Sequence, residues 1–184
     1  MKKNIFYFII ISMLFFSKNI NANDKRTLHE FSFNDVDGKT YSLSQHKNKV
    51  VLLVNVASQC GFTKQYADLQ TLWDKYKSKN FVVIGVPSND FGNQEPGTNA
   101  EIKNFCETNF NINFPIMEKV TVKGKNAHPV YLWAKESYGS ATEPKWNFHK
   151  ILIDKKGKIN DTFISTTNPQ SEKVVKKIEE LINN

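Results

Sequence analysis

Between residues 23 and 92, hydrophobic residues form two nearly unbroken blocks, Val50–Val56 and Phe81–Val86. An apolar block of this length predicts a strand that is buried on both faces of a sheet. Between the blocks, apolar residues recur with helical spacing at Tyr66, Leu69, Leu72, Trp73 and Tyr76. The pattern therefore predicts a strand, a helix that reaches about Ser78, and a second strand parallel to the first.

Weaker signals predict the other elements. The runs Leu28–Val36 and Lys39–Leu43 flank Asp37-Gly38, a pair typical of tight hairpin turns with positive φ angles. Thr98 and Glu101 fit a capping box at the start of a helix that runs to Asn109. The remaining predicted elements are a helix that starts at Pro129, two strands and a closing helix: Pro129–Glu136, Phe148–Ile153, Ile159–Ser165 and Pro169–Ile182.

This order of elements predicts an α/β fold. A hairpin, β, α, β, α, α, β, β, α order describes a mixed central sheet that is flanked by helices and preceded by an N-terminal β-hairpin. With a cysteine placed directly after the first core strand, the order resembles the thioredoxin fold. A fold alone does not assign an activity.

The amino terminus has the pattern of a targeting segment. Lys2 and Lys3 precede the short apolar block Ile5–Phe16, and a polar stretch then leads to Ala22. We expect a signal peptide at residues 1–22, a single domain at residues 23–184, and export, in a bacterium to the periplasm. An uncleaved membrane anchor is the alternative; after cleavage we expect no stable association with a membrane.

The charge pattern limits which classes of partner the protein can bind. The chain has 25 basic and 18 acidic residues, a formal net charge of +7, and Arg26 is its only arginine. Sites that grip phosphate with two hydrogen bonds usually use arginine, so we expect no nucleic-acid partner. The lysine clusters are typical of solvated surfaces.

The chain has two cysteines, Cys60 and Cys106. Their spacing fits no metal motif and the four histidines form no ligand cluster, so we expect neither a metal nor a cofactor. In an exported protein, two cysteines also fit one structural disulfide. The position of each sulfur has to decide between this alternative and a reactive thiol.

Cys60 has the position of a nucleophile. It follows the carboxyl end of a predicted strand and precedes a predicted helix, where unpaired N–H groups and the helix dipole favour a thiolate. Thr63 stands where a Cys-x-x-Cys oxidoreductase would carry its second sulfur, which argues against thioredoxin-like exchange. Ala57 stands where a peroxiredoxin would carry a threonine.

Three segments resemble the signature blocks of the glutathione peroxidase family: Asn55–Thr63, Asn89–Gly97 and Trp146–Ile153. The resemblance implies a thiol peroxidase that reduces hydrogen peroxide and organic hydroperoxides in the response to oxidative stress. It also implies four catalytic residues: Cys60 (peroxidatic), Gln94, Trp146 and Asn147. The last three carry neutral N–H donors, which can stabilise a thiolate without adding charge.

The loop after the second core strand departs from the usual family sequence. Ser88 stands where a cysteine is common, and Asp90 adds a carboxylate near the site. A carboxylate that faced Cys60 would oppose thiolate formation. We therefore expect Asp90 to point away from the sulfur.

The segment Phe105–Pro115 resembles the resolving-cysteine block of the thiol-dependent branch of the family. The resemblance implies that Cys106 closes an internal disulfide with Cys60 and that a thioredoxin-type protein, rather than glutathione, reduces it. Because the two sulfurs lie on different helices, we expect disulfide formation to require local unwinding of the Thr98–Asn109 helix. Only Tyr138–Lys145 precedes the third block, which implies a monomer without the insertion of tetrameric members.

One alternative to this function stays open at the level of the sequence. If the disulfide between Cys60 and Cys106 is permanent, the protein is an exported binding or structural module with a thioredoxin fold.

Overall fold

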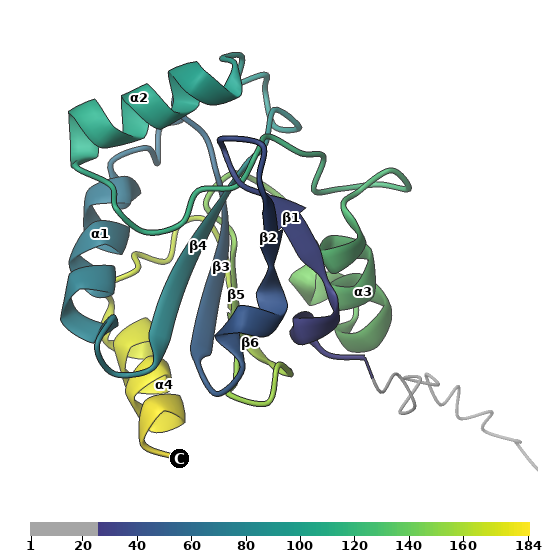
Figure 1. Cartoon of the computed structure of the whole chain (residues 1–184), viewed down its shortest axis with the longest axis vertical. Helices are drawn as coiled ribbons and strands as arrows, with labels where there is room; N and C mark the ends of the chain where they lie inside the picture. The colour runs from purple at the N-terminus through teal and green to yellow at the C-terminus, as the bar shows by residue number, and fades with distance from the viewer. Residues whose placement is uncertain (1–25) are drawn as a thin grey trace, which may run out of the picture.

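The computed structural model describes residues 26–184 as a four-stranded sheet with helices on both faces (Figure 1). The strand order is β4-β3-β5-β6. β3 pairs in parallel with β4 and antiparallel with β5, and β5 pairs antiparallel with β6. The strands are β3 (Val50–Val56), β4 (Phe81–Pro87), β5 (Lys150–Ile153) and β6 (Ile159–Phe163). The predicted signal peptide, residues 1–22, lies outside the described residues.

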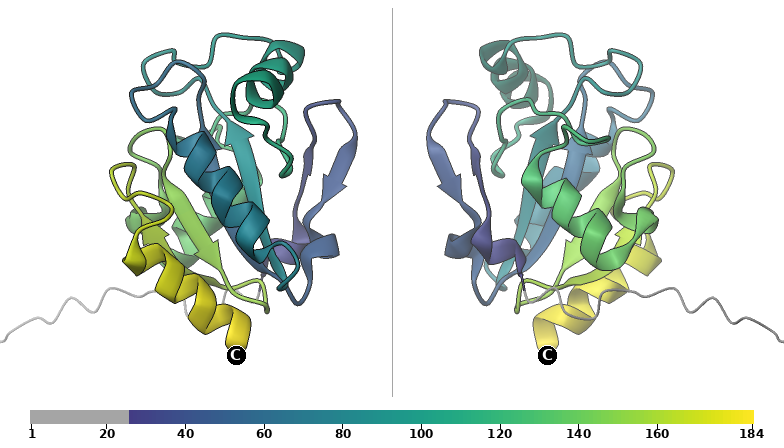
Figure 2. Two further views of the ribbon diagram at one scale, coloured as in Figure 1. Left: turned by 90° about the vertical axis from the view of Figure 1, so that its left-hand side faces the viewer. Right: turned by 90° about the vertical axis from the view of Figure 1, so that its right-hand side faces the viewer.

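Helices cover the two faces of the sheet, as the paired views of Figure 2 show. On one face lie α1 (Gln65–Tyr76) and α4 (Glu172–Asn183), and on the other lies α3 (Pro129–Tyr138). α2 (Asn99–Phe110) lies beyond the ends of the strands, at the top of Figure 1. The mixed, helix-flanked sheet predicted from the sequence is confirmed.

β3 forms the centre of the core because its side chains alternate between the two faces. Leu52 and Val54 belong to the cluster under α1 and α4, whereas Val51 and Leu53 belong to the cluster under α3. All seven residues of β3 are buried. The continuous apolar block in the sequence reflects this burial on both faces.

The N-terminal hairpin is present but shorter than predicted. β1 (Ser32–Asn34) pairs with β2 (Thr40–Ser42), with Phe33 opposite Tyr41. Leu28–Glu30, predicted as strand, is a 3-10 helix, because Thr27 and Glu30 form a capping box. The turn is also wider than a two-residue Asp-Gly turn: Asp35 N–H donates to Lys39 O over 2.7 Å, and only Gly38 has a positive φ.

Other element boundaries differ from the sequence predictions for local reasons. α1 begins at Gln65 rather than immediately after Cys60, because residues 58–64 form turns. β5 begins at Lys150 because Phe148 has a φ of 64°, which no strand accommodates. α4 begins at Glu172, after turns that follow Pro169. Two further 3-10 helices span Leu43–His46 and Ser140–Thr142.

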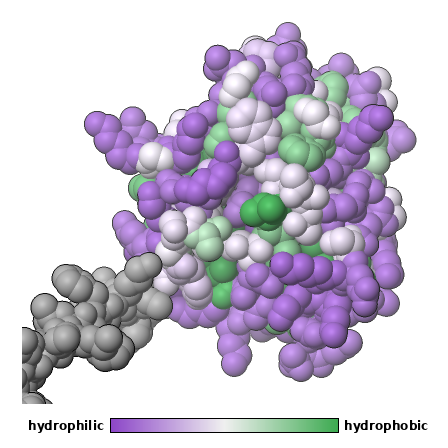
Figure 3. All heavy atoms as spheres, turned by 180° about the vertical axis from the view of Figure 1, so that it is seen from behind, coloured by the Kyte–Doolittle hydropathy of each residue, from purple (hydrophilic) through white to green (hydrophobic). Residues whose placement is uncertain are grey.

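In the part of the chain that the structure describes, no helix has the length and apolar composition needed to cross a bilayer. The face in Figure 3 is mainly hydrophilic, and its hydrophobic residues form small separate patches. On this face nothing marks a broad apolar contact surface.

Candidate active site

The three sequence blocks meet at one edge of the sheet. The parallel strands β3 and β4 end at this edge, with Val56 opposite Pro87. β5 runs antiparallel to β3, with Lys150 opposite Val54, so the segment just before β5 arrives at the same edge. The topology therefore brings Cys60, Gln94 and Asn147 into one region from three distant segments.

Cys60 lies in a turn whose hydrogen bonds hold the sulfur near backbone N–H groups. The Thr63 hydroxyl accepts the Cys60 N–H over 2.9 Å and donates to Ala57 O over 3.0 Å. Cys60 Sγ accepts the N–H of Phe62 over 3.4 Å. Cys60 is largely buried, with 9% of the residue exposed. Thr63, which occupies the place of a second cysteine, closes the turn.

Gln94 and Asn147 form a bonded pair beside this turn. The Asn147 side-chain amide donates to the side-chain oxygen of Gln94, Oε1, over 3.0 Å. The backbone carbonyl of Gln94 accepts the N–H of Gln59 over 3.0 Å. Asn147 is fully buried, and its Oδ1 has no hydrogen-bond partner. The sequence predicted three separate donors around Cys60, but the structure joins two of them to each other.

Trp146 reaches the site by a different route. Its carbonyl accepts the Asn55 side-chain amide over 3.1 Å, and the oxygen of the same Asn55 side chain accepts the N–H of His149 over 3.1 Å. Asn55 on β3 thus holds the segment that carries Trp146 and Asn147. The Trp146 ring is 40% exposed and lies 5.9 Å from the Phe91 ring, centroid to centroid.

Asp90 points away from Cys60, as expected. Its carboxylate accepts the N–H of Val122 over 2.6 Å and that of Lys123 over 3.2 Å. Ser88, which replaces the cysteine common in the family, is fully buried, and its hydroxyl accepts the Asp90 N–H over 3.3 Å. Both residues fix the shape of the loop after β4.

Two charged residues of the site region were missed by the sequence analysis. Glu95 is fully buried, and burial raises the pKa of its carboxyl group although hydrogen bonds from Ser58 oppose the shift. Lys150 is also fully buried; burial lowers the pKa of its amine to about 7, and its Nζ donates to Phe148 O over 2.7 Å. A single lysine at the start of an apolar strand was a visible signal for Lys150. Glu95 stands in a polar loop and gave none.

Cys106 lies in the second half of α2, where it is part of the core and 1% exposed. Burial raises the pKa of its thiol to about 11, and neighbouring Glu95 adds to the rise. The structure contains both cysteines as free thiols. α2 has the predicted capping box, in which Thr98 Oγ1 accepts the Glu101 N–H and the Glu101 carboxylate accepts the Thr98 N–H.

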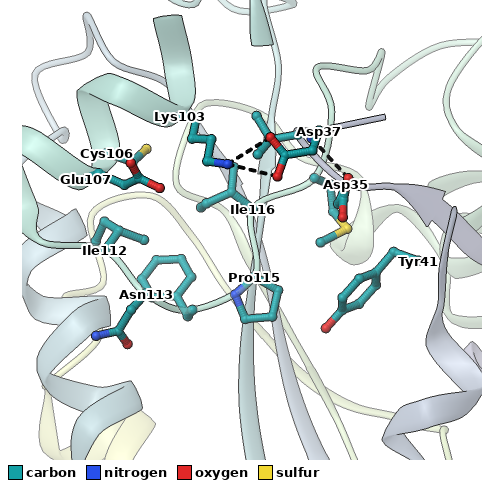
Figure 4. A pocket seen from close by; sticks show the side chains of 13 residues that line it. Asp35, Asp37, Tyr41, Lys103, Cys106, Glu107, Ile112, Asn113, Pro115 and Ile116 are labelled. Carbon is teal, nitrogen blue, oxygen red and sulfur yellow. Dashed lines mark hydrogen bonds and ion pairs between the residues drawn. The ribbon is translucent and has the colours of Figure 1, made fainter. Parts of the chain in front are cut away.

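A cavity of about 300 Å³ separates Cys106 from the N-terminal hairpin (Figure 4). Across it, Lys103 of α2 contacts both carboxylate oxygens of Asp37 at 2.8 Å. Its lining also includes the apolar side chains of Ile112 and Ile116. One exposed ion pair therefore ties the helix that carries Cys106 to the hairpin turn.

Among residues 26–184, no three histidine, cysteine, aspartate or glutamate side chains lie close enough together to hold a metal ion.

Residues 28–135 match the family model for glutathione peroxidase. The chain belongs to the glutathione peroxidase family. A hydroperoxy fatty acid reductase of Synechocystis is 42% identical over 89% of this chain and 100% of its own length. A glutathione peroxidase-like peroxiredoxin of Saccharomyces cerevisiae is 46% identical over 80% of this chain and 91% of its own. The protein is accordingly a thiol peroxidase, which acts on a hydroperoxide and a thiol reductant.

Solved structures support the fold of this family member. A crystal structure titled Trgpx in apo form superposes with a TM-score of 0.71 at 37% identity, over 87% of this chain and 97% of that one. A thioredoxin family protein of Chlorobium tepidum, 19% identical, superposes with a TM-score of 0.61 over 83% of this chain and 92% of that one. The thioredoxin-like fold is confirmed.

The prediction of export to the periplasm is wrong. The relatives of this family member do not support it: an Arabidopsis thaliana relative, 44% identical over 89% of this chain, is named as chloroplastic, and neither the Synechocystis nor the yeast name refers to export. A basic, apolar amino terminus is a short compositional pattern, and such a pattern alone does not establish a destination.

Proposed function

We propose that Cys60 is the peroxidatic nucleophile of this thiol peroxidase, that Cys106 is the resolving thiol and that a thioredoxin-type dithiol is the reductant. One observation carries the proposal: the Cys60 sulfur accepts a backbone N–H and lies in a turn bonded to the Gln94–Asn147 pair. The family assignment supplies the reaction, and this arrangement supplies the residues. We also propose residues 23–184 as one peroxidase domain.

The first step is a substitution at oxygen. The Cys60 thiolate attacks one peroxide oxygen, the S–O bond forms as the O–O bond breaks, and the sulfur is oxidised to a sulfenic acid. The departing hydroxide or alkoxide takes up a proton and leaves as water or an alcohol. Neutral donors suit this step, because they stabilise the anions before and after transfer without altering the charge of the site.

Within the pair, we assign different roles to the two amides. The side-chain oxygen of Gln94 accepts a hydrogen bond from Asn147, so the NH₂ group of Gln94 is the donor for the sulfur or the departing oxygen. Asn147 then acts through Gln94 by fixing the direction of that amide. The exposed Trp146 indole supports a third donor role, because its ring lies at the rim of the site beside Phe91.

In the second step, Cys106 attacks the Cys60 sulfur. The S–S bond forms, the S–OH bond breaks, and the hydroxyl leaves as water with the thiol proton of Cys106. Cys106 is buried in α2 with a pKa of about 11, so α2 must open locally before this attack. An external dithiol then reduces the disulfide by two exchange steps.

The choice of a dithiol rests on two features of the chain. It carries a second cysteine, and its only arginine, Arg26, forms an ion pair with Glu136 over 3.1 Å. We propose a monomer that needs no cofactor and reduces hydrogen peroxide and organic hydroperoxides during oxidative stress. The Synechocystis name supports fatty acid hydroperoxides as one substrate class.

The test is a reductant comparison with purified protein and matched variants. The parent should consume hydroperoxide with thioredoxin, thioredoxin reductase and NADPH, and much less with glutathione and its reductase. Cys60→Ser should be inactive with either, because a serine hydroxyl is hardly ionised near neutral pH. Cys106→Ser should consume one equivalent of hydroperoxide and then stop with thioredoxin.

Each contrary outcome refutes one part of the proposal. Activity in Cys60→Ser would show that Cys60 is not the nucleophile. Normal turnover of Cys106→Ser with thioredoxin removes the resolving role, and equal rates with glutathione remove the dithiol preference. Ser88→Ala is the control variant: it shows how much a small buried change in the neighbouring loop lowers activity without altering a proposed catalytic residue.

A further inference from the structure

The loop that carries Gln94 is fastened to the turn that carries Cys60 by one buried carboxylate. Glu95 Oε2 accepts the Ser58 N–H over 2.9 Å, and Glu95 Oε1 accepts the Ser58 hydroxyl over 2.6 Å. Next to these bonds, the backbone carbonyl of Gln94, one residue before Glu95, accepts the N–H of Gln59, one residue after Ser58, over 3.0 Å. Three hydrogen bonds thus join two adjacent residues of one loop to two adjacent residues of the other.

Glu95 is itself held from behind. Its N–H donates to Asn89 Oδ1 over 2.8 Å, and Lys119 Nζ donates to the carbonyls of Glu95 and Gly97 over 3.2 and 2.6 Å. Lys119 therefore binds the backbone of this loop, while the carboxylate is left to Ser58. The carboxylate cannot turn toward solvent, because Glu95 is fully buried.

Joining two loops by a buried carboxylate has a free-energy cost, because the charged group loses its hydration. Burial disfavours its charged form, which is why the pKa of Glu95 is raised despite the two bonds from Ser58 and the charge of Lys119. A purely structural contact at this place could be apolar, whereas a carboxylate accepts two donors from one residue in a fixed direction. The direction matters here because Cys60 follows Ser58 by two residues and Gln94 precedes Glu95 by one.

We propose that Glu95 is a positioning residue of the peroxidase site, which sets the Cys60 sulfur relative to the Gln94 amide through its two bonds to Ser58. This inference rests on the proposed roles of Cys60 and Gln94. Reaction rates fall steeply when reacting groups are displaced by about 1 Å, so the clamp acts on the oxidation step.

Substitutions of Glu95 separate its geometry from its charge. In Glu95→Gln, the amide oxygen accepts the Ser58 N–H and the amide nitrogen donates to the Ser58 hydroxyl, so the clamp is retained without the charge. In Glu95→Ala both bonds are lost, and in Glu95→Asp the carboxylate is one carbon too short to reach both donors. Asp154→Ala is the matched control, because Asp154 is a partly buried carboxylate that also accepts two donors, the N–H groups of Lys156 and Lys158, in the turn between β5 and β6.

The measurement is the stopped-flow rate of Cys60 oxidation by hydrogen peroxide in a single turnover. Glu95→Ala and Glu95→Asp should be slower by about 10- to 100-fold, and Glu95→Gln should recover to within about threefold of the parent. Ser58→Ala should lose part of the rate, and adding it to Glu95→Ala should cost nothing more. If Glu95→Ala does not fold, the comparison of Glu95→Gln, Glu95→Asp and Ser58→Ala decides by the same criterion.

Two outcomes overturn the inference. One is oxidation of folded Glu95→Ala or Glu95→Asp at the parental rate. The other is equal slowing of Glu95→Gln and Glu95→Ala, which would mean that the charge and not the clamp matters. Mass spectrometry of the parent keeps these outcomes apart from failure of the proposed function, because a parent that is not oxidised at Cys60 refutes the nucleophile itself.

Discussion

Asn147 donates its side-chain amide to the side-chain carbonyl of Gln94 over 3.0 Å, across 53 positions of the chain. Each amide restrains the other through this bond, and burial of Asn147 limits the movement of its side chain. The two proposed donor residues are therefore a coupled pair, in which Asn147 directs the side-chain amide of Gln94.

The coupling predicts a non-additive effect on Cys60 oxidation. Gln94→Ala and Asn147→Ala should each slow the stopped-flow rate, by roughly 100-fold, and the double variant should be no slower than the slower single variant. Asn126→Ala, which removes an exposed amide from another loop, should match the parent. Independent, multiplying losses would show that Asn147 donates to the reacting groups by itself.

The ion pair between Lys103 and Asp37 should restrain the resolving step. If α2 must open before Cys106 can reach Cys60, then Asp37→Asn should speed disulfide formation after oxidation by about two- to fivefold, since exposed pairs are weak. Asp74→Asn, which removes an exposed pair within α1, should leave the rate unchanged. High salt should speed the parent but not Asp37→Asn. If Asp37→Asn forms the disulfide at the parental rate, the ion pair with the hairpin does not restrain α2.

The reactivity of Cys106 should depend on the charge of Glu95. Burial, then the negative charges of Glu95 and Glu107, raise the pKa of this thiol to about 11, while the neighbouring Tyr66 hydroxyl opposes the rise. Glu95→Gln removes one of those charges, so the pKa of Cys106 should fall and its alkylation below pH 11 should become faster. The comparison is made in a Cys60→Ser background by mass spectrometry. Glu101→Gln, which removes an exposed carboxylate from the first turn of α2, should give an unchanged pH profile, because the charge of Glu101 is not among those that raise the pKa of Cys106.

Lys150 should make the stability of the fold rise with pH. Its pKa is about 7 in the folded protein and near 10.4 in an unfolded chain, so between these values the unfolded chain binds more protons and the free energy of unfolding increases. From pH 7 to pH 9, the gain from this group is about 2 kcal/mol. Lys150→Met should lack that gain in urea unfolding measured at both pH values. Parallel pH dependence in parent and variant would show that the amine titrates normally.

Much of the fold could be predicted because the signals that specify it are local. The apolar block Val50–Val56 predicted the central strand, and the Thr98–Glu101 capping box predicted the start of α2. Both depend on residues within a few positions of each other. The predictions failed where two local signals compete: Leu28–Glu30 has strand-like composition, yet the capping box at Thr27 makes it a 3-10 helix.

The family, the thiol peroxidase reaction and the residues proposed to perform it follow from the sequence, because they depend on which residue types stand in three ordered blocks. The tertiary structure alone decided how those residues are connected. The bond from Asn147 to Gln94 forms because β5 runs antiparallel to β3, and the clamp of Glu95 on Ser58 forms because β4 runs parallel to β3. No local pattern encodes such contacts, since a buried amide or carboxylate finds its partner only after the strands have paired.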